Sequence, residues 1–109
     1  MRRDTGLPPG TLDMLILRVL AGEPLHGYAI AQRIHQLSSE ELSVEEGSLY
    51  PALQRMLIKG WVTAEWGVTA GNRRARYYRL TKAGRKQLWA ELSQFQRVNQ
   101  AILRVIQMA

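Results

Sequence analysis

The residues with the clearest chemical character are arginines in the second half of the chain. Arg73, Arg74 and Arg76 follow Gly71 and Asn72, two residue types that favour a tight turn. Seven of the 15 lysines and arginines lie at positions 73, 74, 76, 79, 82, 85 and 86, and no Asp or Glu occurs between residues 66 and 90. Cations concentrated in this way predict contact with the phosphates or minor groove of a nucleic acid. The alternative is an ordinary solvated turn.

The segment just before these arginines, residues 47–60, has the spacing of an amphipathic helix. Its polar face offers side chains that could reach base edges or phosphates: Ser48, Tyr50, Gln54 and Arg55. Periodicity alone would also fit a surface helix without a ligand. The basic hairpin that follows favours DNA binding, because a winged helix presents its recognition helix and then its wing in this order.

The remaining polar residues do not predict an enzyme. There is no Cys, and His26 and His35 are the two histidines, which excludes disulfides and thiolate metal sites. The carboxylates lack the spacing of an acid pair or of a His-x-x-Glu motif, and we assign them to caps, solvated faces and loops: Asp13, Glu23, Glu40, Glu41, Glu45 and Glu46. We expect no catalytic residue, no metal and no cofactor.

The composition is that of a single domain with an anionic partner. The chain has 109 residues, of which 46% are hydrophobic, and a formal net charge of +6. This size suits one core, and the charge suits nucleic acid or an anionic membrane surface. The most apolar run, residues 12–21, contains Asp13 and Arg18 and is too short to span a bilayer. We expect a cytoplasmic protein without membrane insertion.

Capping and turn signals predict the order helix, helix, helix, strand, strand, long helix. Thr11 is the predicted cap of the first helix, and Gly22 is predicted to stop it. The second helix is expected to begin near His26 and Gly27 and to run towards residues 38–39.

The third helix has two possible starts. A capping box at residues 43–46 favours the earlier start, with Pro51 loosening one turn, whereas a cap at Ser48 would place Pro51 in the first turn. We favour the earlier start. Gly60 is well placed as the left-handed residue after the helix end.

Two β-prone segments follow, residues 61–66 and 75–80, and residues 67–72 between them have the composition of a hairpin turn. Because alternate residues of a strand share a face, Tyr78 is expected in the core with Leu80. Tyr77 is then expected to be exposed.

Thr81 is the predicted cap of a last helix that reaches residue 107. At 1.5 Å per residue this helix is about 40 Å long, too long to be covered entirely by its own domain. We therefore expect it to build a homodimer and divide the chain into a DNA-binding domain, 1–80, and a dimerisation helix, 81–109. A heptad seam with one polar member supports this: Leu88, Leu92, Phe95, Asn99, Ile102 and Ile106. The alternative is packing of the helix onto its own domain.

Four segments in order resemble the PadR family of transcriptional regulators: LPPGTLDMLIL at 7–17, HGYAI at 26–30, GSLYPAL at 47–53 and RYYRLTKAG at 76–84. The resemblance covers nearly the whole chain. It implies a mainly α fold with a small β-hairpin, which is a winged helix-turn-helix plus a long C-terminal dimerisation helix. It also implies a homodimeric repressor that binds double-stranded DNA with its third helix, at Ser48, Tyr50 and Gln54, and with its wing, at Arg74 and Arg76.

The single C-terminal helix resembles the short branch of the family, and residues 7–17 and 72–78 resemble a subgroup found beside permease genes. In some short members an aromatic residue of the last helix lines a drug-binding cavity between subunits. By that resemblance Phe95 and Trp89 could bind a small planar apolar or cationic effector. The alternative is that Phe95 belongs to the dimer core. For the whole chain, the rival function is a winged helix that binds another protein without specific DNA binding.

Overall fold

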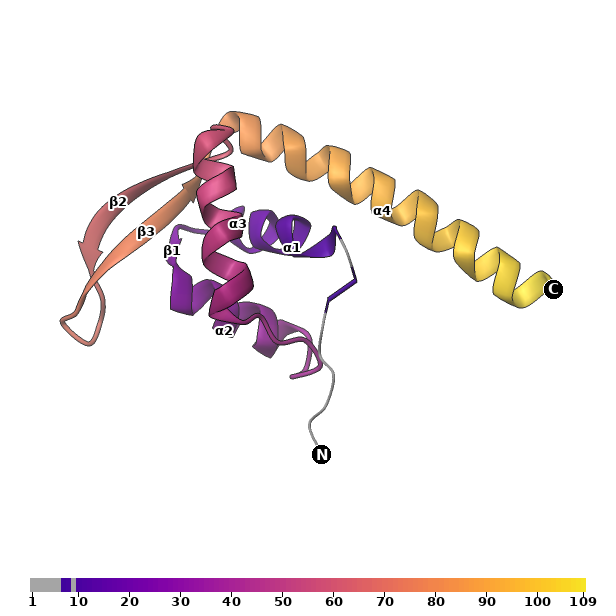
Figure 1. The fold of residues 1–109 in the computed structure, drawn as a ribbon, viewed down its shortest axis with the longest axis horizontal. Coiled ribbons are helices and arrows are strands. Elements are labelled where there is room, and N and C mark those ends of the chain that lie inside the picture. Colours follow the sequence, from indigo (N-terminus) through magenta and orange to yellow (C-terminus); the bar gives the residue numbers. More distant parts are fainter. Residues whose placement is uncertain (1–6, 9) are drawn as a thin grey trace.

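The computed structural model describes residues 7, 8 and 10–109. Figure 1 shows a bundle of helices beside a small twisted sheet, and a long C-terminal helix that extends away from them. The sheet is antiparallel and has the order β1-β3-β2. This α+β arrangement, a winged helix followed by a long C-terminal helix, confirms the predicted fold class. The elements are α1 (Thr11–Leu20), β1 (Leu25–His26), α2 (Gly27–Leu37), α3 (Glu46–Ile58), β2 (Val62–Val68), β3 (Arg74–Leu80) and α4 (Lys82–Met108).

One apolar core joins α1, α2, α3, the sheet and the start of α4. Its members recur at helical spacing in the helices and alternate along the strands. Burial of each such side chain contributes about 1.5–3 kcal/mol. The largest fully buried side chains are Ile16, Leu17, Ile30, Leu49, Leu53, Met56 and Val62. The core therefore holds α3 by one face and leaves its other face outward.

The predicted cap of α1 is wrong. Gly10, in the left-handed region at φ 83°, occupies the capping position, and Thr11 is the first helical residue. The Thr11 hydroxyl donates to the carbonyl oxygen of Pro8 at 2.7 Å. The Thr11 side chain, which was expected to accept a hydrogen bond from a backbone N–H of the helix, thus bonds to the preceding turn instead.

His26 caps α2, so the expected start of this helix is confirmed. Its Nδ1 accepts a hydrogen bond from the backbone N–H of Ala29 at 3.3 Å. Residues 25–26 also form β1, which pairs with Tyr78 and Tyr77 of β3. The sequence does not predict this strand, because two residues carry no alternation pattern. The start of α2 is thereby joined to the hairpin.

Helix α3 begins at Glu46, after a capping residue, Glu45, that makes no side-chain capping bond. Neither expected start is therefore correct, and Ser43 is not part of a capping box. Residues 41–45 carry no helical turn, and Leu42 and Val44 within them pack partly against the core. Burial of these two side chains in a non-helical segment overrides the local capping signal.

The end of α3 is as predicted. Gly60 is left-handed at φ 76°. Its N–H donates to the Leu57 carbonyl at 3.1 Å, and the Trp61 N–H donates to the Met56 carbonyl at 2.9 Å. These two bonds form a Schellman motif, in which a residue without Cβ costs least.

The hairpin turn is closed by Thr69, whose N–H donates to the Arg73 carbonyl at 2.8 Å, with Asn72 left-handed at φ 62°. Tyr78 is buried, at 5% exposure, as expected. Tyr77 is partly buried rather than exposed, which corrects the prediction. Its ring lies across Gly67 of the neighbouring strand, which has no side chain to keep it away.

The junction between the hairpin and α4 is closely packed around the carbonyl oxygen of Trp61. The Thr81 N–H donates to this oxygen at 2.9 Å, and the Thr81 hydroxyl lies 3.0 Å from it. The same hydroxyl accepts from the Gly84 N–H at 3.0 Å, which confirms Thr81 as the cap of α4. A Cβ added to Gly84 would overlap the Trp61 carbonyl oxygen. The direction of α4 thus depends on this contact.

Candidate nucleic-acid interface

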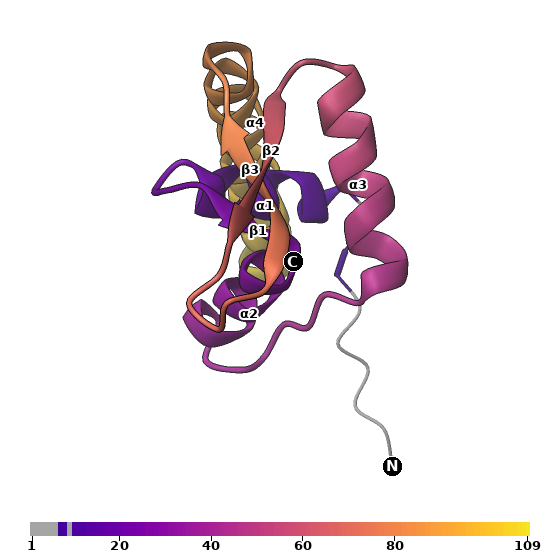
Figure 2. The same cartoon turned by 90° about the vertical axis from the view of Figure 1, so that its left-hand side faces the viewer.

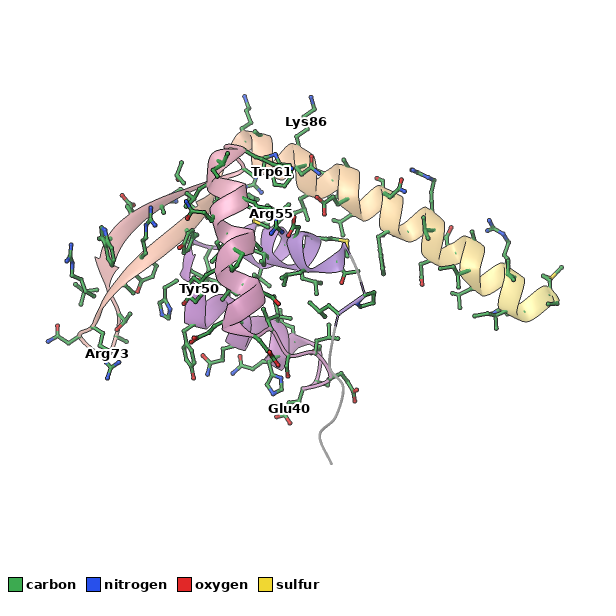
Figure 3. All side chains as sticks on the ribbon, in the orientation of Figure 1. Glu40, Tyr50, Arg55, Trp61, Arg73 and Lys86 are labelled. Atoms are coloured by element: carbon green, nitrogen blue, oxygen red, sulfur yellow. The ribbon has the colours of Figure 1, made fainter. Side chains whose placement is uncertain are left out.

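Helix α3 buries Leu49, Leu53 and Met56 and exposes Ser48 and Gln54. Figure 3 shows α3 on the outside of the molecule, with Tyr50 and Arg55 on it and Arg73 at the tip of the hairpin. The exposed side chains of α3 are free to meet an external partner. The four predicted α3 residues nevertheless differ in their surroundings.

Tyr50 is the most constrained of the four. Its hydroxyl lies against the start of α2, where a Cβ added to Gly27 would be 2.6 Å from the hydroxyl oxygen. Partial burial, and then the nearby Glu46 and Tyr78, raise the pKa of Tyr50 above its ordinary value. The side chain is 44% exposed. It therefore helps to fix α3 on α2, and its contact with DNA stays a prediction.

Arg55 lies on the α1 side of the helix. Its guanidinium donates to the Asp13 carboxylate at 2.9 Å, and the two side chains are 54% and 25% exposed. An ion pair this exposed contributes about 0–1 kcal/mol. The structure therefore assigns Arg55 a contact that sequence reasoning missed, because 42 positions separate the partners. It does not bring Arg55 to the wing arginines.

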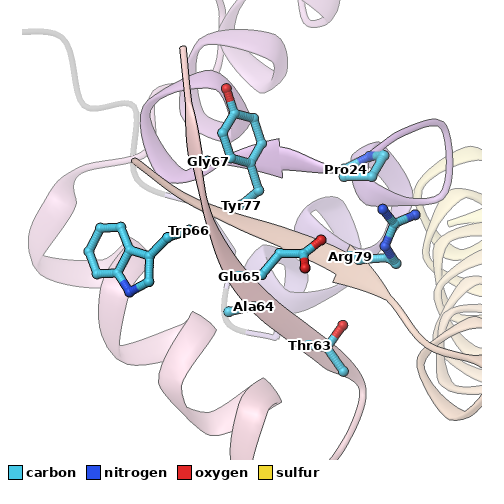
Figure 4. Close-up of a pocket in the computed structure, with 8 residues that line it drawn as sticks. All are labelled: Pro24, Thr63, Ala64, Glu65, Trp66, Gly67, Tyr77 and Arg79. Atoms are coloured by element: carbon cyan, nitrogen blue, oxygen red, sulfur yellow. The ribbon is translucent and has the colours of Figure 1, made fainter. Parts of the chain in front are cut away.

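The hairpin, β2 and β3, carries two different faces. The register pairs Trp66 with Arg76 and Val68 with Arg74. Since neighbouring residues alternate, these four side chains share one face, and Tyr77 lies on the other. Figure 4 shows Trp66 pointing away from the side that carries Tyr77. Two of the three predicted wing arginines are thus together on one face, and Arg73 is in the turn.

This arginine-bearing face is on the same side as α3. Arg76 shares its face of β3 with Tyr78 and Leu80, which are buried in the core with Leu53 and Met56 of α3. Figure 2 shows α3 beside the hairpin, joined to it at one end. The structure therefore places Arg74 and Arg76 on the side of the hairpin that faces α3.

The other face of the hairpin has a hollow of ≈ 350 Å³, drawn in Figure 4. Among its lining residues are Pro24, Glu65, Tyr77 and Arg79. Here a carboxylate accompanies the single arginine, so this face attracts phosphate less than the face with Arg74 and Arg76.

The seam predicted on α4 divides into two parts. Leu88 is buried at 3% exposure in the core of its own chain, and Leu92 packs against that core. Beyond them the exposed fractions are 43% for Phe95, 52% for Ile102 and 67% for Ile106, and Asn99 is exposed as well. The alternative of self-packing therefore holds for the start of α4, and the remaining seam is uncovered in the single chain.

A hollow of ≈ 520 Å³ lies between the start of α1 and α4. Phe95, Val98, Met14 and Glu91 are among its lining residues, and Trp89 is not. Trp89 is 63% exposed and, six positions from Phe95, points to another side of the helix. The two aromatic side chains expected to share a ligand site do not share one within the chain.

Two other kinds of feature are absent from the part of the chain that the structure describes. None of the helices there is both long and apolar enough to cross a membrane. In the same residues, no group of three or more His, Cys, Asp or Glu side chains could hold a metal ion.

The fold defines a winged-helix protein, a class that includes DNA-binding proteins. The model of the transcriptional regulator PadR-like family matches residues 16–90, and the chain belongs to this family. It is therefore a transcriptional regulator, of a family that acts on transcription by binding DNA.

Individual proteins are similar to the chain over most of its length. The chain is 31% identical over 91 residues to an uncharacterized protein X of Lysinibacillus sphaericus, which covers 78% of this chain and 84% of that protein. A transcriptional regulator from Clostridium thermocellum has a TM-score of 0.79 at 26% identity, covering 87% of this chain and 92% of its own. A PadR family transcription regulator from Clostridium difficile has a TM-score of 0.77 at 25% identity, with coverages of 89% and 99%.

Proposed function

We propose that the chain is a repressor that binds a pseudo-palindromic operator as a homodimer. The observation that carries this proposal is that the hairpin presents Arg74 and Arg76 on the face that lies on the α3 side. A helix in the major groove and cations on the adjacent backbone need this arrangement. Ser48 and Gln54, two exposed polar residues of α3, are the proposed base readers, with Tyr50 at the edge.

The uncovered half of α4 supports the homodimer. Phe95, Ile102 and Ile106 form an apolar stripe along a helix that projects from its domain, and water-exposed stripes of this kind mark interfaces. We take residues 1–80 as the DNA-binding part and 81–109 as the dimerisation helix, with the first turns of α4 shared between the two. A two-fold dimer presents α3 twice, which predicts half-sites about one helical turn apart.

Arginine substitutions test DNA binding by the wing. Arg74→Ala and Arg76→Ala should each weaken binding to the chain's own upstream region and to random DNA alike. Each should also lower the slope of log K against log salt by about one unit, because each arginine then neutralises one phosphate less. Fluorescence anisotropy at a series of salt concentrations measures both quantities.

Arg79→Ala is the matched control, because it removes the same charge from the opposite face of β3. For Arg79→Ala the slope of log K against log salt should change less than it does for Arg74→Ala and Arg76→Ala. Equal effects of all three variants would show that only net charge matters and would remove the wing from the interface. A wild-type chain that binds no DNA would favour the rival function, recognition of another protein.

An effector is the second part of the proposal. The hollow beside Phe95 offers an aromatic face, two apolar neighbours, Met14 and Val98, and the carboxylate of Glu91. These groups suit a planar apolar or cationic compound. Release of DNA further requires that the compound prefer a dimer geometry in which the two copies of α3 no longer match the grooves. Parallel titration of planar dyes against wild type and Phe95→Ala, with operator occupancy followed, tests this proposal.

A further inference from the structure

Trp66 lies outside the four segments that resemble the PadR family and outside the predicted set of DNA-contacting residues. Its side chain is 60% exposed, and the guanidinium carbon of Arg74 lies 4.6 Å from the centre of its ring. We propose that Trp66 is a positioning residue of the wing, which holds the Arg74 guanidinium ready to donate to a DNA phosphate. This inference rests on the proposed DNA binding.

The strand register makes this contact specific to one face. Trp66 is directly opposite Arg76, and Arg74 is diagonal to it, opposite Val68. The indole therefore shares the α3 side of the hairpin with the side chains of Arg74 and Arg76. On the reverse of the hairpin Tyr77 covers Gly67, so the strand beneath Trp66 is packed from behind. A large exposed ring is thereby supported at a fixed place in the wing.

A stacked arginine is still able to bind phosphate. Stacking uses the flat face of the guanidinium, and its N–H donors point outward in the plane, where they can make a bidentate contact with phosphate oxygens. A guanidinium that is already ordered also loses less conformational entropy when DNA binds. Trp66 would therefore raise affinity without itself having to contact DNA.

The charges around the pair support an external anionic partner. Among the residues that the structure describes, Arg33 pairs with Glu23 and Arg55 pairs with Asp13, and neither ion pair involves a wing arginine. Glu65 is adjacent to Trp66 in sequence but belongs to the opposite face. The positive charge of Arg74 is thus presented next to an aromatic ring and away from that carboxylate.

A double-mutant cycle tests the inference. Affinity for the upstream DNA is measured by anisotropy for wild type, Trp66→Ala, Arg74→Ala and the double variant. Trp66→Ala should weaken binding by about two- to tenfold, the range expected when one long side chain has to be ordered on binding. In the Arg74→Ala background the same change should have almost no effect, and Trp66→Phe should restore part of the loss. Coupling of this kind is not expected from a merely structural residue.

Val68→Ala is the control, because Val68 is on the same face, 64% exposed and opposite Arg74 but has no aromatic ring. It should bind DNA within twofold of wild type, and thermal melting checks that every variant is folded. The positioning role would be overturned if the affinity losses of Trp66→Ala and Arg74→Ala multiplied in the double variant. It would also be overturned if Val68→Ala lost as much affinity as Trp66→Ala. If the wild type binds DNA and Arg74→Ala does not change the affinity, the positioning role is overturned too. DNA binding by α3 would not be contradicted by that result. A wild type that binds no DNA would overturn the proposed function and this inference together.

Discussion

Gly84→Ala is expected to destabilise the protein by about 3 kcal/mol, the upper end of the usual cost of overpacking. The added methyl group would overlap the Trp61 carbonyl oxygen and approach Leu80. That oxygen cannot easily withdraw, because the Thr81 N–H donates to it and it belongs to the backbone. The melting temperature should fall by roughly 10 °C or more, as measured by circular dichroism at fixed protein concentration.

Gly47→Ala is the matched control, since Gly47 is also near the start of a helix and has nothing within 4 Å of an added Cβ. It should be neutral or stabilising by about 0.5–1 kcal/mol, because alanine loses less backbone entropy in a helix. If Gly84→Ala had the same melting temperature as the wild type, the junction between the hairpin and α4 would be loose and could not set the direction of α4. The proposed spacing of the two recognition helices would then lack its structural basis.

Ile102→Asp is expected to convert the homodimer into monomers. Ile102 is 52% exposed in the single chain, so the substitution should leave the winged domain folded. In a dimer that covers the stripe, however, it would bury a carboxylate without a partner, at a cost of about 3–5 kcal/mol. Light scattering at micromolar concentration gives the mass of each species. Operator affinity should fall as well, because a monomer presents a single copy of α3.

Gln100→Asp provides the comparison, because it introduces the same charge on the exposed, opposite side of α4. This variant should remain dimeric. A wild type that is monomeric would refute the homodimer, whereas an Ile102→Asp variant that stayed dimeric would place the interface elsewhere. Leu88 would be unsuitable for this test, since it is buried in its own domain and a charge there would unfold the chain.

The sequence by itself determined the order of the elements other than β1, and the features that depend on neighbours within a few residues. The left-handed Gly60, the Thr81 cap and the start of α2 near His26 were all predictable, because capping bonds join residues three to five positions apart. The exposed face of α3 and the basic hairpin tip followed from periodicity and from the run of arginines. The burial of Tyr78 followed from alternation along β3.

Tertiary structure alone decided which partner each side chain meets. The packing of Leu42 and Val44 moved the start of α3 away from its capping signal. The ion pair of Arg55 with Asp13 joins residues 42 positions apart, and the contact of Arg74 with Trp66 depends on the strand register. Periodicity identifies an apolar face but not what covers it, so only the folded chain separates the buried Leu88 from the exposed Ile102 on one helical stripe.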